Sequence, residues 1–239
     1  MELVAQGLSI ARTSCMRAAA RNVRLAGALL LAALMVTPAQ AAAGEPVILV
    51  FGDSLSAEYG LARGTGWAAL LDARLKQQRL PFSVVNASIS GETTSGGAAR
   101  IDLALKQHQP TVIIIELGGN DGLRGLALDA TRANLTRMIE ASHKAGARVL
   151  LAGMQLPPNY GRAYGEQFQR LYTELAQRHK SALVPLFLDG VAERRELFQA
   201  DGIHPTAAAQ PRLLDNTWSV LAPLLSKPKP DAAGSGKRK

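Results

Sequence analysis

Apolar and polar residues follow two different periods along this chain, and the two periods alternate. Short apolar runs rich in Val, Ile and Leu predict β-strands, because these residues pack well on a pleated surface. The runs lie at residues 47–51, 83–86, 112–117, 148–152 and 182–187. These stretches contain few charged residues, which is typical of strands buried on both faces of a parallel sheet.

Stretches with helical spacing separate the predicted strands. Residues 67–78, for example, place Leu70, Leu71 and Leu75 on one helical face. Further helices are expected up to Gln107, over 129–144, over 165–178 and from about Gln210. Alternation of strands and helices predicts one α/β domain, with a parallel sheet covered by helices on both faces.

Polar turn-forming residues follow the first three predicted strands. The sequences after them are Gly-Asp-Ser at 52–54, Asn-Ala-Ser-Ile-Ser-Gly at 86–91 and Gly-Gly-Asn-Asp at 118–121. Ligand sites of open parallel sheets form at the carboxyl ends of the strands. We therefore expect the functional site at this edge of the sheet.

One of the four histidines is the candidate catalytic base. His108, His143 and His179 fall at expected helix ends, where a polar or cationic side chain complements the negative end of the helix. His204 instead lies in a loop before the last helix, and imidazole is the side chain best suited to accept a proton near neutral pH. Asp201, three residues earlier, can orient the imidazole ring.

Ser54 is the candidate nucleophile, because it ends the first strand at the same edge. A serine at this position can also cap the following helix, so both interpretations stay open. The oxyanion of an acyl-transfer reaction needs preorganised donors, and the candidates are the Ser54 and Gly91 amides and the Asn120 side chain. Taken alone, Gly91 and Asn120 are explained slightly better by turn formation. Asp53 is expected to stabilise the turn by accepting amide hydrogen bonds.

Composition divides the chain into three parts, at 1–43, 44–226 and 227–239. The first part holds several Arg residues, an apolar run at 25–36 and then small residues, which together predict a secretory signal peptide cleaved after Ala41 or Ala43. The run is shorter than the roughly 20 apolar residues of a membrane anchor. We therefore expect a periplasmic or secreted protein without a stable membrane anchor, translated from Met1 or from Met16.

The net charge of +8 lies mainly outside the predicted domain. The first part carries +3 and the last part +4, which leaves +1 for residues 44–226. A nearly neutral domain lacks the basic surface of nucleic-acid-binding proteins. The last part has no apolar residue larger than Ala, so we expect a disordered tail, although contact with anionic lipid is an alternative.

Four sequence blocks together resemble those of the SGNH (GDSL) hydrolases. The blocks are FGDSLSAEYGL, NASISGETTSGG, ELGGNDGLRG and DGIHP, and the likeness extends over residues 46–225. The resemblance implies a flavodoxin-like fold with a five-stranded parallel sheet between helices. It implies Ser54, His204 and Asp201 as the catalytic triad, with Ser54, Gly91 and Asn120 in the oxyanion hole.

The family likeness also implies an activity. We expect hydrolysis of small acyl esters, thioesters and lysophospholipids by a monomeric enzyme without metal or cofactor. Met154, Leu156 and Tyr160 follow the fourth strand and are candidate substrate-binding residues, although packing of a surface loop would also explain them. Two other functions stay open, a metal-dependent phosphoesterase and a non-catalytic acyl-binding protein.

Overall fold

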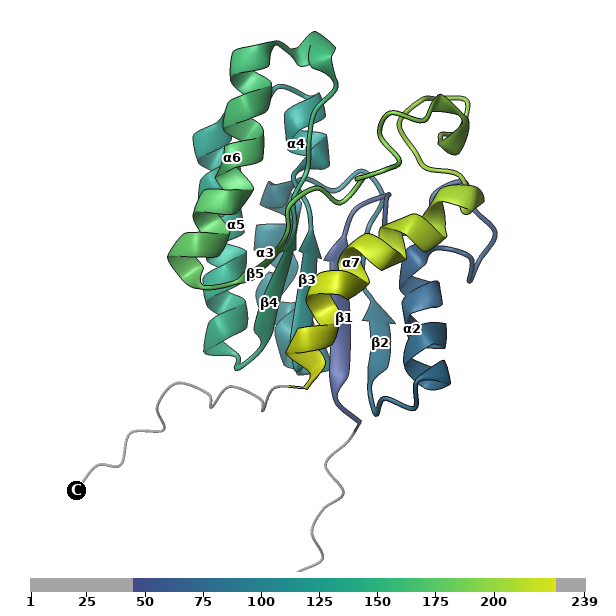
Figure 1. The fold of residues 1–239 in the computed structure, drawn as a ribbon. Coiled ribbons are helices and arrows are strands. Elements are labelled where there is room, and N and C mark those ends of the chain that lie inside the picture. The colour runs from purple at the N-terminus through teal and green to yellow at the C-terminus, as the bar shows by residue number, and fades with distance from the viewer. Residues whose placement is uncertain (1–44, 227–239) are drawn as a thin grey trace, which may run out of the picture. The chain divides into compact units, whose positions relative to one another are not determined.

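The computed structural model describes residues 45–226 (Figure 1). The predicted signal peptide and the predicted basic tail lie outside the described residues. Within 45–226, no helix is both long enough and apolar enough to cross a bilayer.

Five parallel strands form one sheet in the order β2-β1-β3-β4-β5. Their bounds are β1 Val47–Gly52, β2 Ser83–Asn86, β3 Val112–Glu116, β4 Arg148–Ala152 and β5 Ala182–Val184. Every residue of β3 and β4 is buried, because helices cover both faces of the sheet. The fold prediction, an α/β domain with a five-stranded parallel sheet, is confirmed.

Helices cover the sheet in two layers. α2 (Trp67–Gln77) packs with α7 (Gln210–Leu225), whereas α3 (Thr94–His108), α5 (Leu128–Lys144) and α6 (Arg162–His179) pack in sequence against one another. The chain moves from β1 outward to β2 and then returns across β1 to β3. Right-handed crossovers in opposite directions place their helices on opposite faces, which accounts for the two layers (Figure 1).

The sheet order changes direction between β1 and β3, and this point positions the site. β1 and β3 are adjacent, but β2 and its helix intervene in the sequence. The segments that leave the two strands therefore diverge toward opposite faces and leave room for a ligand at the carboxyl edge.

The structure differs from the sequence prediction at several element ends. β5 ends at Val184 and not at residue 187, because Pro185 has no N–H to donate to a neighbouring strand. α6 begins at Arg162, three residues earlier than expected. The short helix α4 (Gly119–Leu123) was not predicted, since its Gly and Asn residues have low helix propensity. Within residues 45–226, three 3₁₀ helices complete the fold, η2 (Pro158–Tyr160), η3 (Arg195–Leu197) and η4 (Ala207–Ala209).

Candidate active site

The candidate residues reach one edge of the sheet from four separate segments. Ser54 follows β1, Gly91 lies between β2 and α3, and Asn120 is the second residue of α4. Asp201 and His204 lie in the loop between η3 and η4.

Ser54, His204 and Asp201 form a continuous hydrogen-bonded chain. The Ser54 Oγ atom lies 2.9 Å from His204 Nε2, and His204 Nδ1 lies 2.7 Å from Asp201 Oδ2. Because a carboxylate accepts a hydrogen bond, the proton of neutral His204 resides on Nδ1, which leaves Nε2 free to accept the Ser54 proton. The three side chains therefore have the arrangement that acyl transfer by a serine nucleophile requires.

The Asp201 carboxylate is exposed and is held by hydrogen bonds. The hydrogen bond from the His204 ring lowers the pKa of Asp201 well below its usual value, and the backbone N–H groups of Ile203 and His204 lower this pKa further. Both N–H groups donate to Oδ1, at 2.9 Å and 3.0 Å. The same carboxylate therefore shapes the loop and orients the imidazole ring.

The loop around His204 is also attached to the segment that follows Ser54. The Gln199 amide N–H donates to the His204 carbonyl at 2.8 Å. The Gln199 side-chain amide donates to the carbonyls of Tyr59 and Pro205, at 2.9 Å and 3.2 Å. The Tyr59 ring lies over the imidazole of His204, with ring centroids 4.3 Å apart. Tyr59 and Gln199 are thus two residues near the triad that the sequence did not single out.

Gly91 and Asn120 flank the site as the two predicted oxyanion donors beyond Ser54. Gly91 has φ +79°, a conformation that favours glycine, and it is exposed at the edge of the site. The Asn120 Nδ2 group donates to Asp53 Oδ2 at 3.0 Å and to the Glu92 carbonyl at 3.1 Å. One of these two N–H groups must turn toward the substrate if Asn120 is to bind an oxyanion.

Comparison with known proteins identifies the family. Residues 50–211 match the GDSL-like Lipase/Acylhydrolase family. The chain belongs to this family. Membership supports an acyl-ester hydrolase over the metal-dependent phosphoesterase and the non-catalytic binding protein that the sequence left open.

Several relatives of this GDSL-like hydrolase match it over most of their length. Esterase TesA of Pseudomonas aeruginosa is 51% identical over 205 residues, which cover 86% of this chain and all of the relative. Thioesterase 1/protease 1/lysophospholipase L1 of Escherichia coli is 42% identical and covers 77% of this chain and 88% of the relative. The solved structure of esterase EstA from Pseudoalteromonas, inhibited by monoethylphosphonate, superimposes with a TM-score of 0.72 at 37% identity, covering 76% and 99% of the two chains.

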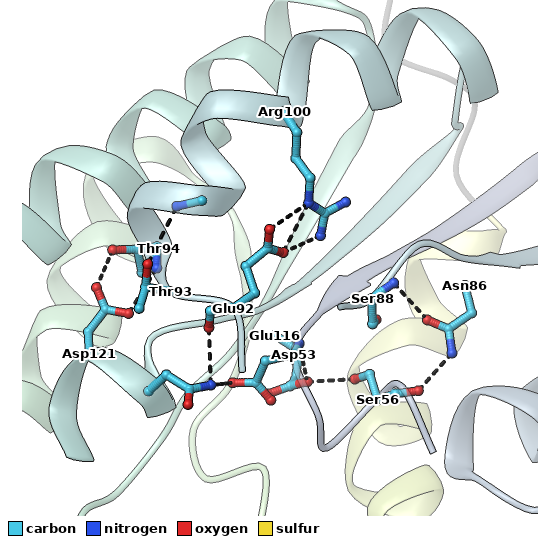
Figure 2. Close-up of polar contacts among 12 residues, drawn as sticks. Asp53, Ser56, Asn86, Ser88, Glu92, Thr93, Thr94, Arg100, Glu116 and Asp121 are labelled. Atoms are coloured by element: carbon cyan, nitrogen blue, oxygen red, sulfur yellow. Dashed lines mark hydrogen bonds and ion pairs between the residues drawn. The ribbon is translucent and has the colours of Figure 1, made fainter. Parts of the chain in front are cut away.

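Two carboxylates of this GDSL-like hydrolase, those of Asp121 and Glu92, stabilise the segments that contain Gly91 and Asn120 (Figure 2). Asp121 accepts hydrogen bonds from the Thr94 amide at 2.8 Å and from the Thr94 hydroxyl, which attaches α4 to the start of α3. The Glu92 carboxylate pairs with the Arg100 guanidinium, whose Nε atom lies 2.7 Å and 3.0 Å from its two oxygens. Neither contact could be predicted from the sequence, because both join residues that no local pattern links.

Two buried carboxyl groups lie beside the segment that contains Ser54, the candidate nucleophile. Asp53 is 2% exposed, and its Oδ1 atom accepts the Leu55 amide at 3.0 Å, which confirms its predicted role in the turn. Glu116, the last residue of β3, has no exposed surface and accepts the Ser56 hydroxyl at 2.6 Å. Burial raises the pKa of Asp53 to about 6 and raises the pKa of Glu116 well above its usual value.

The three predicted substrate-binding residues lie against the core of this hydrolase. Met154 and Leu156 are 4% and 7% exposed, and Tyr160 is half-buried and packs on the same core. The Leu156 side chain lies against Gly122 of α4, the helix that also carries Asn120. Substrate binding by these residues stays a prediction. Within residues 45–226, no group of three or more His, Cys, Asp or Glu side chains is arranged to hold a metal ion.

Proposed function

We propose that Ser54, His204 and Asp201 form the catalytic triad of an esterase that acts on small acyl esters and thioesters. The observation that carries this proposal is the hydrogen-bonded chain from Ser54 Oγ through the imidazole to Asp201, with distances of 2.9 Å and 2.7 Å. The family membership supports the reaction class.

The first half of the cycle forms an acyl-enzyme. His204 Nε2 takes the Ser54 hydroxyl proton while Oγ attacks the carbonyl carbon of the substrate. The carbonyl π bond opens, and its electron pair moves to the oxygen. The resulting imidazolium then donates its proton to the leaving alcohol or thiol as the bond to the acyl carbon breaks. Asp201 stays ionised throughout and stabilises the imidazolium.

Three hydrogen-bond donors stabilise the oxyanion in this proposal. They are the backbone N–H groups of Ser54 and Gly91 and the side-chain amide of Asn120. Their supporting contacts are the Glu92–Arg100 pair on the Gly91 loop and the Thr94–Asp121 contact beside Asn120. Donors held in place before the reaction cost no reorganisation when charge develops on the oxygen.

The second half of the cycle returns the enzyme to its starting state. A water molecule gives one proton to His204 Nε2 and attacks the acyl carbon. Collapse of the tetrahedral intermediate releases the carboxylic acid and restores the Ser54 hydroxyl with the proton from the imidazolium. No step of this cycle uses a metal or cofactor.

The names of the relatives suggest the substrates. The E. coli relative is named as a thioesterase and a lysophospholipase, and we propose the same substrate classes for this chain. Met154, Leu156 and Tyr160 would contact the acyl chain near Asn120. We further propose export to the periplasm or the medium, on the strength of the signal-peptide pattern in residues 1–43.

A panel of substrates tests the proposal. The panel contains p-nitrophenyl esters of increasing acyl length, a lysophospholipid and an acyl thioester. We expect hydrolysis of all three classes by the protein without its first 43 residues, and no measurable hydrolysis by Ser54→Ala. Ser219→Ala, an exposed serine of α7, is the matched control and should behave as the unaltered protein. Full activity of Ser54→Ala would overturn the proposal.

A further inference from the structure

The buried carboxyl groups of Asp53 and Glu116 are not needed for the proton transfers of the proposed cycle. They nevertheless lie together in a part of the molecule closed to solvent (Figure 2). Asp53 precedes Ser54 in the sequence and accepts a hydrogen bond from the Asn120 side chain, and Glu116 accepts one from the Asp53 amide. Two adjacent buried carboxylates would repel one another, and each would lose its hydration. The hydrogen bonds around the pair indicate how this cost is avoided.

The contacts of Ser56 determine which oxygen of Glu116 is an acceptor. The Trp67 indole can only donate, and its Nε1 atom lies 3.2 Å from Ser56 Oγ. Ser56 therefore accepts from Trp67 and must direct its single hydroxyl proton to Glu116 Oε2, at 2.6 Å. The Asp53 amide lies 3.3 Å from the same oxygen and is a second donor. Glu116 Oε2 thus accepts two hydrogen bonds.

The other oxygen of Glu116 has no donor. Oε1 is buried and has no hydrogen-bond partner among the described residues. An ionised oxygen without a donor in such a place is costly, whereas a protonated oxygen carries no charge. Glu116 is therefore best accommodated as a neutral acid, whose proton the neighbouring Asp53 carboxylate can accept.

Asp53 has the opposite environment, because both of its oxygens accept hydrogen bonds. Oδ1 accepts the Leu55 amide and Oδ2 accepts the Asn120 side-chain amide, each at 3.0 Å. Charges near Asp53 act in both directions: His204 lowers its pKa, and Glu92 raises it. The Glu92 carboxylate is itself paired with Arg100, which reduces its repulsion of Asp53.

We propose that Asp53 and Glu116 hold a single proton, located on Glu116, and that ionised Asp53 is a positioning residue for Asn120. The inference rests on the proposed function, in which Asn120 binds the oxyanion. Asp53 fixes one N–H of the Asn120 amide, so the other, which donates to the Glu92 carbonyl, is the one that turns to the substrate oxygen. Without Asp53 the amide would lose the contact that sets its orientation.

Two isosteric variants test which carboxyl group is charged. Asp53→Asn leaves one acceptor oxygen for two donors, the Leu55 amide and the Asn120 side chain, so one of them faces an NH₂ group. We expect kcat to fall about 10- to 100-fold with KM little changed. Glu116→Gln replaces one neutral group by another and should lower kcat less than about threefold. Asp102→Asn, on the exposed surface of α3, is the control for loss of a carboxylate elsewhere.

Infrared difference spectroscopy locates the proton without relying on activity. At neutral pH the unaltered protein should show the carbonyl stretch of a protonated carboxyl group, which Glu116→Gln removes and Asp53→Asn retains. Circular dichroism verifies that each variant is folded. If the stretch is absent from the unaltered protein, or if Glu116→Gln is the more damaged variant, the assignment of the proton is wrong.

The same assays separate this inference from the proposed function. Ser54→Ala is measured alongside, and its inactivity supports the proposed triad. An inactive Ser54→Ala with an undiminished Asp53→Asn would overturn only the positioning role of Asp53. An active Ser54→Ala would instead overturn the function on which the inference rests.

Discussion

The two sides of Ser54, the proposed nucleophile, hold their carboxyl groups in opposite ways. Asp201, on the histidine side, lies in an exposed loop, where hydrogen bonds from His204 and from two backbone amides keep its pKa low. Asp53 and Glu116, on the strand side, are buried, and loss of hydration raises the pKa of both. The Asp201 carboxyl group is therefore ionised, whereas in our proposal Asp53 and Glu116 hold one proton between them.

The difference separates the part of the site that is built on the buried strand ends from the part that is built on an exposed loop. Ser54 and Asn120 are held by residues at the ends of β1 and β3, which are adjacent strands. His204, the proposed base, lies in a loop whose hydrogen bonds are open to water. We expect changes near the strand ends to affect stability as well as activity, whereas changes in the loop should affect mainly activity.

The largest effect is expected from His204→Ala, which removes the base and leaves Ser54 without a proton acceptor. We expect kcat to fall by about 10⁴-fold or more, with the thermal midpoint little changed. Steady-state hydrolysis of a short p-nitrophenyl ester measures kcat, and calorimetry measures the thermal midpoint. A loss smaller than about tenfold would show that another group accepts the Ser54 proton.

Asn120→Ala is expected to have the next largest effect. Removing one oxyanion donor costs about 10²–10³ in kcat. The change also leaves Asp53 Oδ2 without its donor, so the thermal midpoint should fall as well. Unchanged kcat together with a lower midpoint would assign Asn120 a structural role only.

Asp201→Asn should be milder than either change, because the carboxylate is exposed. Its side chain is 38% exposed, so water can partly replace the lost acceptor. We expect kcat to fall about 10- to 10²-fold, less than in enzymes where this residue is buried. If Asp201→Asn is as inactive as His204→Ala, the contrast between an exposed and a buried carboxyl group has no functional meaning.

The smallest effect is on stability, and it depends on pH. If folded Glu116 keeps a proton that the unfolded chain releases, the stability of the unaltered protein falls as pH rises above the usual pKa of Glu. Glu116→Gln lacks this dependence. Its thermal midpoint relative to the unaltered protein should therefore rise between about pH 5 and about pH 8, by roughly 3 °C for each unit of pKa shift. A constant difference would show that Glu116 is ionised.

Much of the site could be predicted because it depends on strand exits. Apolar runs identified the five strands, and the carboxyl-edge rule for parallel sheets then placed Ser54, Gly91 and Asn120 at one edge. Helix-end positions of the other histidines left His204 as the candidate base, and the structure brings it to 2.9 Å from Ser54 Oγ.

Other features depend on contacts that no local pattern encodes. Glu116 is the polar end of an apolar strand, and its partner Ser56 lies 60 residues away in sequence. The ring contact of Tyr59 with His204 joins two loops that are distant in sequence. The burial of Leu156 follows from its packing against Gly122 of α4, a helix that periodicity did not predict.

A phosphonate label tests the central claim, that Ser54 is the nucleophile, most directly. A serine that attacks a phosphonate ester forms a stable adduct, and the structural relative EstA is described as inhibited by monoethylphosphonate. The protein is incubated with a p-nitrophenyl phosphonate ester, digested and examined by peptide mass spectrometry. We predict one adduct, on Ser54, and the labelled fraction should rise in proportion to the loss of activity. Complete inactivation with Ser54 unmodified, or with the adduct on Ser56 or Ser88, would contradict the account.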